Sequence, residues 1–210
     1  MAQRKKSEGK KSDKKAAKKK AAKKAAKKGA GAPAPLRKSG RPVVGILTGS
    51  PSDLPVVMKA RDVLEQLDIP SDIRVLSAHR TPVATVQYVT AAREAGIEVL
   101  IACAGMAAHL AGVVAAHPTP PVIGVPLAPG APAGLDALLP PVQMPPGIPV
   151  ATVGVDGSRN AAFLAARILT LKHPELIPRL EAQLELNKTR YDSPNLDIPG
   201  QALAGPKKKR

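Results

Sequence analysis

Two short segments carry the side chains best suited to catalysis. Thr-Gly-Ser-Pro-Ser-Asp occupies residues 48–53, and Ser-Ala-His-Arg-Thr-Pro occupies residues 77–82. His79 can move protons because imidazole titrates near neutral pH. Arg80 can hold a phosphate or a carboxylate through its planar guanidinium. Gly49 permits a tight turn with close backbone approach. These residue types predict proton transfer on an anionic substrate.

The first segment supports two interpretations. The hydroxyls of Ser50 and Ser52, together with the N–H groups of a following helix, would suit a bound phosphate or carboxylate. Alternatively, Ser52 or Asp53 is simply the N-cap of that helix. The segment matches neither a Walker loop nor a GxGxxG fingerprint, so neither a nucleoside triphosphate nor NAD is indicated.

The remaining histidines and the single cysteine favour structural roles. Residues 104–112 read Ala-Gly-Met-Ala-Ala-His-Leu-Ala-Gly, and these small side chains let a ligand lie against the backbone. His109 in that segment is expected to be satisfied by a neighbouring carbonyl. His117 and His173 are expected at helix ends, where the helix dipole favours them. Cys103 is expected to be a small buried hydrophobe. No cluster has metal-ligand spacing, so we predict no metal.

Five apolar runs alternate with helical patterns, and these elements must position the candidate residues. The runs lack polar alternation, so they predict strands buried on both faces of a parallel sheet. We expect strands at residues 43–47, 73–78, 98–104, 121–126 and 149–155. We expect helices at residues 54–67, 82–95, 107–116, 160–171 and 174–187. The predicted fold class is α/β: a three-layer α/β/α sandwich around a five-stranded, parallel, doubly wound, flavodoxin-like sheet.

Punctuating residues support the second helix. Thr81 is expected as its cap, Pro82 as its first residue and Gly96 as the glycine that ends it. Ligands of doubly wound sheets bind beyond the carboxyl ends of the strands. The loops to inspect therefore follow the strands, and they include both segments that carry the candidate side chains.

The charge of the chain is concentrated in its two ends. The formal net charge is +16 over 210 residues. Residues 1–41 hold 17 basic and 2 acidic residues, the last four residues are all basic, and residues 42–206 carry a charge of −3. We therefore expect a disordered Lys/Ala-rich tail at 1–41, a folded domain at 42–192 and a Pro/Gly and basic tail at 193–210. The stretch between the charged ends, residues 42–206, is long enough to bury one core.

Composition excludes several classes of protein. No apolar run approaches the ~20 residues of a membrane span, and no apolar segment follows the charged N-terminus as in a secretory signal. One cysteine cannot form an internal disulfide, so a reducing cytoplasm fits best. Without Trp, and with two Tyr and one Phe, the folded part is poorly equipped to stack on bases.

Collinear motifs resemble one enzyme family. GSPSD, SAHRTP, AGMAAHLAG, PVIGVP, GLDALL, VQMPPGIPVATV and NAAFLAARIL occur in the order typical of N5-carboxyaminoimidazole ribonucleotide mutase. This is the class I form of the catalytic subunit of phosphoribosylaminoimidazole carboxylase. The resemblance covers about residues 42–190 and leaves out both tails.

The resemblance implies a specific reaction and site. The enzyme moves a carboxylate from the exocyclic nitrogen N5 to carbon C4 of one imidazole ribonucleotide, without metal, ATP or organic cofactor. The resemblance assigns proton transfer to His79 and assembly as an octamer, with sites at subunit boundaries and C-terminal helices in the contacts. The substrate-binding residues it implies are Ser50, Ser52, Asp53, Ser77, Arg80, Ala104, Gly105 and Ala107.

The chain departs from the family pattern at several positions. Met106 stands where glycine is common, and Ala128-Pro129 stands where Gln-Ser is usual. Cys103 stands where the family usually has glycine, and Pro51 stands where it commonly has an acidic or polar residue. Three alternatives therefore stay open. A sister class carboxylates the unsubstituted aminoimidazole with free CO2, but it usually reads Ala-His-Lys and lacks the AAHL run. The others are an inactive binding module and a nucleic-acid-binding protein acting through its basic tail.

Overall fold

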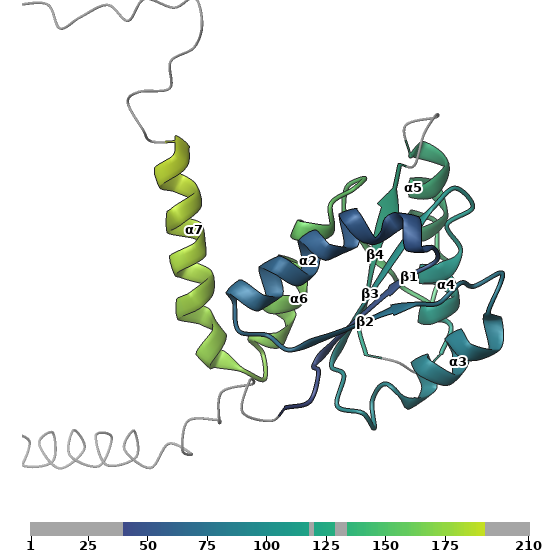
Figure 1. Ribbon diagram of the computed structural model, residues 1–210, viewed down its shortest axis with the longest axis horizontal. Coiled ribbons are helices and arrows are strands. Elements are labelled where there is room, and N and C mark those ends of the chain that lie inside the picture. The colour runs from purple at the N-terminus through teal and green to yellow at the C-terminus, as the bar shows by residue number, and fades with distance from the viewer. Residues whose placement is uncertain (1–39, 118–119, 129–133, 192–210) are drawn as a thin grey trace, which may run out of the picture. The chain divides into compact units, whose positions relative to one another are not determined.

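The computed structural model describes residues 40–117, 120–128 and 134–191, all within one compact unit that spans residues 36–210 (Figure 1). The predicted tails at 1–41 and 193–210 fall almost entirely outside the described residues. Among the described residues, no helix is both long and apolar enough to cross a membrane.

A five-stranded parallel sheet forms the centre of this unit. Its strands are β1 (Val44–Thr48), β2 (Ser71–Val75), β3 (Val99–Gly105), β4 (Val122–Leu127) and β5 (Ala151–Thr152). Their order is β2-β1-β3-β4-β5, and every pairing is parallel. This is the flavodoxin-like order, so the predicted fold class is confirmed.

Helices cover both faces of the sheet (Figure 1). They are α2 (Leu54–Gln66), α3 (Pro82–Ala91), α4 (Leu110–Ala115), α5 (Leu135–Val142), α6 (Ser158–Leu169) and α7 (Ile177–Tyr191), with 3-10 turns η2 (Pro51–Asp53) and η3 (Pro174–Leu176). Alternate residues of β3 point to opposite faces: Ile101 packs with α2 and α6, whereas Leu100 packs with α3 and α4. Burial on both faces explains why β3 has no polar alternation.

The two outer strands differ from their predictions. β2 is partly exposed along its whole length because it is the edge strand of the sheet, so burial on both faces was wrong for it. β5 pairs over two residues only, and the predicted strand at 149–155 was too long. Pro149 has no N–H to donate, and Gly154 lies in the loop before α6. Central strands β1 and β4 are buried throughout, as expected.

The helix ends show where local signals held. Pro82 begins α3, and Thr81 precedes it, but the Thr81 hydroxyl bonds Ser77 instead of capping the helix. α3 ends at Ala91 with Ala92 as its C-cap, so the predicted helix end at Ala95 was wrong. Gly96, with a φ of 95°, instead closes the turns that follow, where the Ile97 N–H donates to the Ala92 carbonyl.

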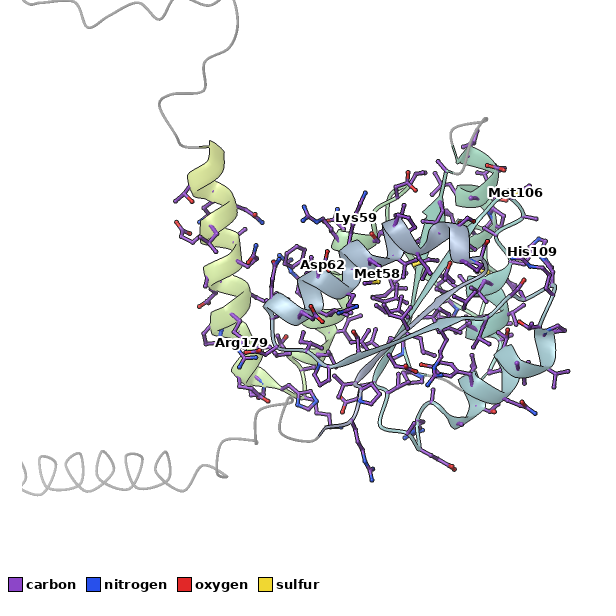
Figure 2. All side chains as sticks on the ribbon, viewed as in Figure 1. Met58, Lys59, Asp62, Met106, His109 and Arg179 are labelled. Carbon is purple, nitrogen blue, oxygen red and sulfur yellow. The ribbon has the colours of Figure 1, made fainter. Side chains whose placement is uncertain are left out.

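Three helices differ from expectation. α5 had not been predicted, because its two internal prolines, Pro140 and Pro141, argue against a helix. α4 begins at Leu110 instead of residue 107, because the chain first makes a turn at Met106. The last helix starts as a 3-10 turn before α7, and Arg179 of α7 donates to the Leu67 carbonyl at the end of α2 (Figure 2).

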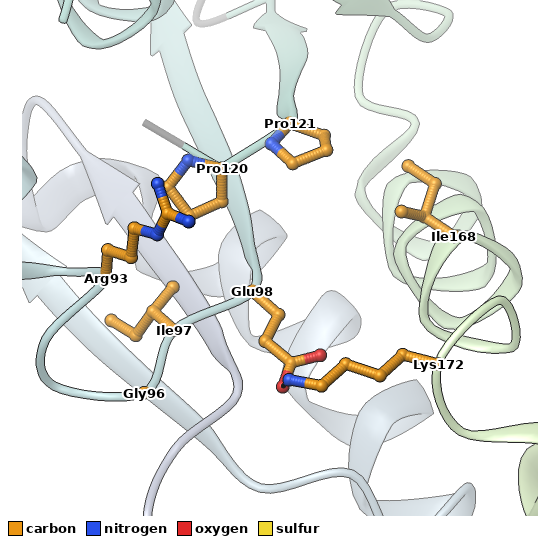
Figure 3. Close-up of a pocket in the computed structure, with 8 residues that line it drawn as sticks. All are labelled: Arg93, Gly96, Ile97, Glu98, Pro120, Pro121, Ile168 and Lys172. Carbon is orange, nitrogen blue, oxygen red and sulfur yellow. Dashed lines mark hydrogen bonds and ion pairs between the residues drawn. The ribbon is translucent and has the colours of Figure 1, made fainter. Parts of the chain in front are cut away.

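The amino ends of the strands carry a closed ionic cluster. Glu98, just before β3, accepts from Lys172 at 2.6 Å (Figure 3). It also contacts His173 at 2.8 Å. His173 lies just beyond the end of α6, as expected, and its side chain pairs with a carboxylate. His117 lies just beyond the end of α4, as expected, and its Nδ1 is 2.9 Å from the Val113 carbonyl oxygen. Burial alone would raise the pKa of Glu98, but the bonds from Lys172 and His173 outweigh it and lower that pKa.

The Glu98 cluster predicts a loss of stability in acid. A carboxyl whose pKa is lowered by folding stabilises the protein above its ordinary pKa of 4.5, and this stabilisation is lost as the pH falls below that value. We expect Glu98→Gln to remove about 1 kcal/mol of the free energy of unfolding at pH 7 and to flatten its decline in acid. Denaturant unfolding at several pH values measures both, with the exposed Glu94→Gln as control. An unchanged acid profile in Glu98→Gln would contradict this role.

Candidate functional site at the carboxyl edge of the sheet

The loops that follow β1, β2 and β3 surround one cavity of about 370 Å³. Parallel pairing brings the carboxyl ends of these strands to the same edge, so segments far apart in sequence converge there. All nine residues implied by the family resemblance line this cavity: Ser50, Ser52, Asp53, Ser77, His79, Arg80, Ala104, Gly105 and Ala107.

The first loop is a network of hydroxyls around one carboxylate. The hydroxyl oxygens of Ser50 and Ser52 lie 2.8 Å apart. Asp53 accepts from the buried Thr48 hydroxyl at 3.2 Å and from the Ser52 hydroxyl at 3.3 Å. Two of these hydroxyls, those of Ser50 and Ser52, line the cavity. The carboxylate of Asp53 is thereby held in a fixed position at the cavity wall.

The helix start in this loop differs from both interpretations of its sequence. Ser50 is the capping side chain, and it caps the 3-10 turn η2; neither Ser52 nor Asp53 caps α2 with its side chain. The N–H of Ser52 donates to the Ser50 hydroxyl, and that of Asp53 donates to the Ser50 carbonyl. The N–H groups of these two residues, which were expected to be free, are thus already bonded.

Arg80 connects the first loop to the second. Its guanidinium donates to the Gly49 carbonyl, and its Nε donates to the Ser77 hydroxyl at 3.4 Å. Ser77 is buried, and its backbone bonds the Thr81 hydroxyl and N–H, which closes the turn after β2. Arg80 is itself exposed to the cavity side of this turn, where a guanidinium can hold an anionic group.

His79 has a partner that the sequence interpretation missed. Its Nε2 lies 2.9 Å from Nδ1 of His109, which is 30 residues away in the chain, and the two rings meet edge to face with centroids 5.1 Å apart. The expected structural role of His109, bonded to a neighbouring carbonyl, was wrong. One of the two nitrogens must carry the shared hydrogen, so the tautomers of the rings are coupled.

A signal for this pair was present in the sequence. His79 is the fourth residue after the end of β2, and His109 is the fourth after the end of β3. Both loops leave the same edge of a parallel sheet, so histidines at similar distances beyond two strands were candidates to meet. However, β1 lies between β2 and β3 in the sheet, so the contact could not be predicted without knowing the register of the three strands.

The third loop combines small residues with one strained residue. Met106 has a φ of 54°, in the left-handed region that costs a non-glycine residue about 1–2 kcal/mol. This backbone explains why glycine suits the position. Ala128, in the fourth loop, donates its N–H to Asp156 at 3.1 Å; Pro129 lies outside the described residues.

Comparison with known proteins identifies the chain. A family model described as AIR carboxylase matches residues 43–190. The chain belongs to the AIR carboxylase family. The N5-carboxyaminoimidazole ribonucleotide mutase of Pyrococcus abyssi is 55% identical over 148 residues, which are 70% of this chain and 85% of that protein. The mutase of Mycobacterium tuberculosis is 53% identical over 142 residues, 68% of this chain and 82% of that protein.

A solved structure shares the AIR carboxylase fold. Treponema denticola PurE superposes with a TM-score of 0.64 at 31% identity, covering 72% of this chain and 94% of that one. The family match spans β1 to α7 and therefore includes every loop that lines the cavity. Among the described residues, no group of three or more His, Cys, Asp or Glu side chains is arranged to hold a metal ion.

The reactivity of Cys103 tests whether β3 is buried below the cavity. The thiol is fully buried in β3, and burial, with a smaller effect of the Asp53 charge, raises its pKa to about 12. Because the thiolate is the nucleophile, we expect no reaction with a thiol reagent such as DTNB at pH 8 in the native protein. One thiol per chain should react once the protein is unfolded in guanidinium chloride. Rapid labelling of the native protein would show that β3 is more open than described.

Proposed function

We propose that this protein is an N5-carboxyaminoimidazole ribonucleotide mutase, a purine-biosynthesis isomerase that forms 4-carboxy-5-aminoimidazole ribonucleotide. The observation that carries the proposal is the single cavity that gathers His79, Arg80 and the serine loop in a chain of the AIR carboxylase family. The names of the relatives, at 46–55% identity, support the same activity. We propose no metal or organic cofactor, because the reaction needs only proton transfer and positioning.

The chemistry balances with one proton carrier. The substrate carboxylate is a carbamate on N5. His79 gives a proton to N5 while the N5–carboxyl bond breaks, and CO2 is released within the cavity. Carbon C4 of the electron-rich imidazole attacks this CO2, forming a carbon–carbon bond. The C4 proton then returns to His79, which restores aromaticity and the starting state of the enzyme, so the net reaction is an isomerisation.

The polar residues divide the remaining work. Arg80 is the cation of the cavity, and together with the hydroxyls of Ser50 and Ser52 it would hold the substrate phosphate. Asp53, fixed by Thr48, would accept from the ribose hydroxyls or the amine. Ala104, Gly105 and Ala107 leave space for the imidazole against the backbone. Positioning of this kind keeps CO2 next to C4.

His109 would act through His79. The shared hydrogen between the two rings means that a change in protonation of His79 Nε2 requires His109 to adapt. We therefore propose that His109 orients the His79 ring and sets its tautomer. This arrangement leaves the other nitrogen of His79, Nδ1, to face a different partner.

Carboxylation of aminoimidazole ribonucleotide with free CO2 is the alternative activity within this family. Arg80 in place of lysine, and the run at 107–110, favour the mutase. An inactive binding module is a further alternative. Catalysis is favoured over it because His79, Arg80 and Ser50 bring a proton carrier, a cation and a hydroxyl to one cavity.

Assembly and location are further parts of the proposal. We propose a homo-octamer with sites near subunit boundaries. Exposed apolar side chains on α5, namely Leu135, Leu139 and Val142, support a contact surface because such groups gain from burial. The single buried thiol suits a reducing cytoplasm.

A direct assay tests the mutase. Purified full-length protein should convert the N5-carboxylated substrate and show little activity with aminoimidazole ribonucleotide and CO2. We expect His79→Asn to lower kcat by roughly a hundredfold or more, because it removes the proton carrier. His117→Asn, a histidine outside the cavity, is the matched control. Activity with CO2 alone, or full turnover by His79→Asn, would overturn the proposal.

The basic tail supports a second, separate function. Residues 1–41 carry a charge of +15, whereas the body of the protein is mildly acidic. We propose that this tail contacts nucleic acid through phosphates without sequence preference, an interaction that releases counterions and therefore weakens in salt.

Deletion of residues 1–40 separates the two functions. In a gel shift with duplex DNA, full-length protein should bind about tenfold or more weakly when salt rises from about 50 to about 200 mM. The deletion should abolish the shift and leave mutase turnover unchanged, because the tail lies outside the family match. DNA binding that survives the deletion would contradict this role of the tail.

A further inference from the structure

Thr81 stands directly before α3, but its side chain bonds the turn that precedes the helix. The Thr81 hydroxyl accepts from the Ser77 N–H at 2.9 Å and donates to the Ser77 carbonyl at 3.2 Å. The Thr81 N–H donates to the same carbonyl at 3.0 Å. The side chain makes no capping bond to α3, so its hydroxyl serves the turn at 77–81. These bonds hold the two ends of that turn together.

The turn carries His79 and Arg80 between its bonded ends, and both residues line the cavity. Arg80 has an anchor outside the turn, because its guanidinium donates to the Gly49 carbonyl of the first loop. The His79 ring contacts His109, which lies in the third loop and is itself exposed. The position of His79 therefore depends more on the turn than the position of Arg80 does.

One bond to Ser77 has no substitute among the bonds of the turn. Without the Thr81 hydroxyl, the Ser77 carbonyl would still accept from the Thr81 N–H and from the buried Thr85 hydroxyl, which lies 3.3 Å away. The Ser77 N–H, in contrast, has the Thr81 hydroxyl as its acceptor, and Ser77 is buried. A buried N–H that loses its acceptor is costly, so the turn would rearrange until this group is bonded again.

We propose that Thr81 is a positioning residue, whose hydroxyl holds the turn so that His79 stays within reach of the substrate atoms that gain and lose the proton. This inference rests on the proposed mutase function. Thr81 is not one of the residues that line the cavity, so it acts through the turn and not by touching substrate. Proton transfer requires hydrogen-bond distance, and a misplacement of about 1 Å costs roughly a hundredfold in rate.

Thr81→Val tests the proposal because it replaces the hydroxyl with a methyl group of similar size. We expect kcat to fall roughly tenfold, because His79 is displaced by part of an ångström. The KM should change less than about twofold, because Arg80 keeps its bond to the Gly49 carbonyl. Calorimetric titration with the product, 4-carboxy-5-aminoimidazole ribonucleotide, should give an unchanged number of sites per chain, which shows that the loss of kcat is not a loss of folded protein.

Two further variants isolate the hydroxyl. Thr81→Ser keeps it and should restore kcat to near that of the unaltered protein. Thr90→Val is the matched control, since Thr90 is an exposed residue of α3 whose hydroxyl also bonds backbone carbonyls, those of Val86 and Gln87, but lies outside the cavity. It should leave both kcat and KM unchanged.

Three results would overturn the positioning role of Thr81. They are a full kcat in Thr81→Val, an equal loss of kcat in the serine and valine variants, and a fall in kcat that is matched by a loss of product-binding sites. Failure of the unaltered protein to convert the N5-carboxylated substrate would instead overturn the mutase function.

Discussion

Parallel pairing of β1 with both β2 and β3 is the constraint on which the site depends. It places the three carboxyl ends at one edge, where their loops meet. The bond from Arg80 to the Gly49 carbonyl then ties the first loop to the second. The third loop is joined by the contact between His79 and His109. Each connection spans 30 or more residues of chain, so none would form without the register of the sheet.

The two edges of the sheet use similar residue types for different purposes. At the amino ends, Glu98 pairs with Lys172 and His173, which fastens the segment after α6 to the start of β3. At the carboxyl ends, His79 and Arg80 are exposed beside a cavity. Mutual neutralisation suits stability, whereas a histidine and a guanidinium facing a cavity suit proton transfer on an anion.

The wall of the cavity after β3 combines small residues with one residue in a strained backbone conformation. Alanine and glycine at the end of β3 and after it make room for a planar ring, and Met106 lines the cavity beside them. β3, which ends just before Met106, is held on both sides by β1 and β4. A rigid strand can therefore support an unfavourable turn at its end.

The sequence by itself determined the alternation of strands and helices, the parallel sheet and the loops that carry His79, Arg80 and Ser50, because continuous apolar runs and turn residues are local signals. Only the tertiary structure decided that β2 is partly exposed, that α5 forms despite Pro140 and Pro141, and that His109 meets His79. Edge position, packing and strand register depend on residues distant in the chain, and no local pattern records them.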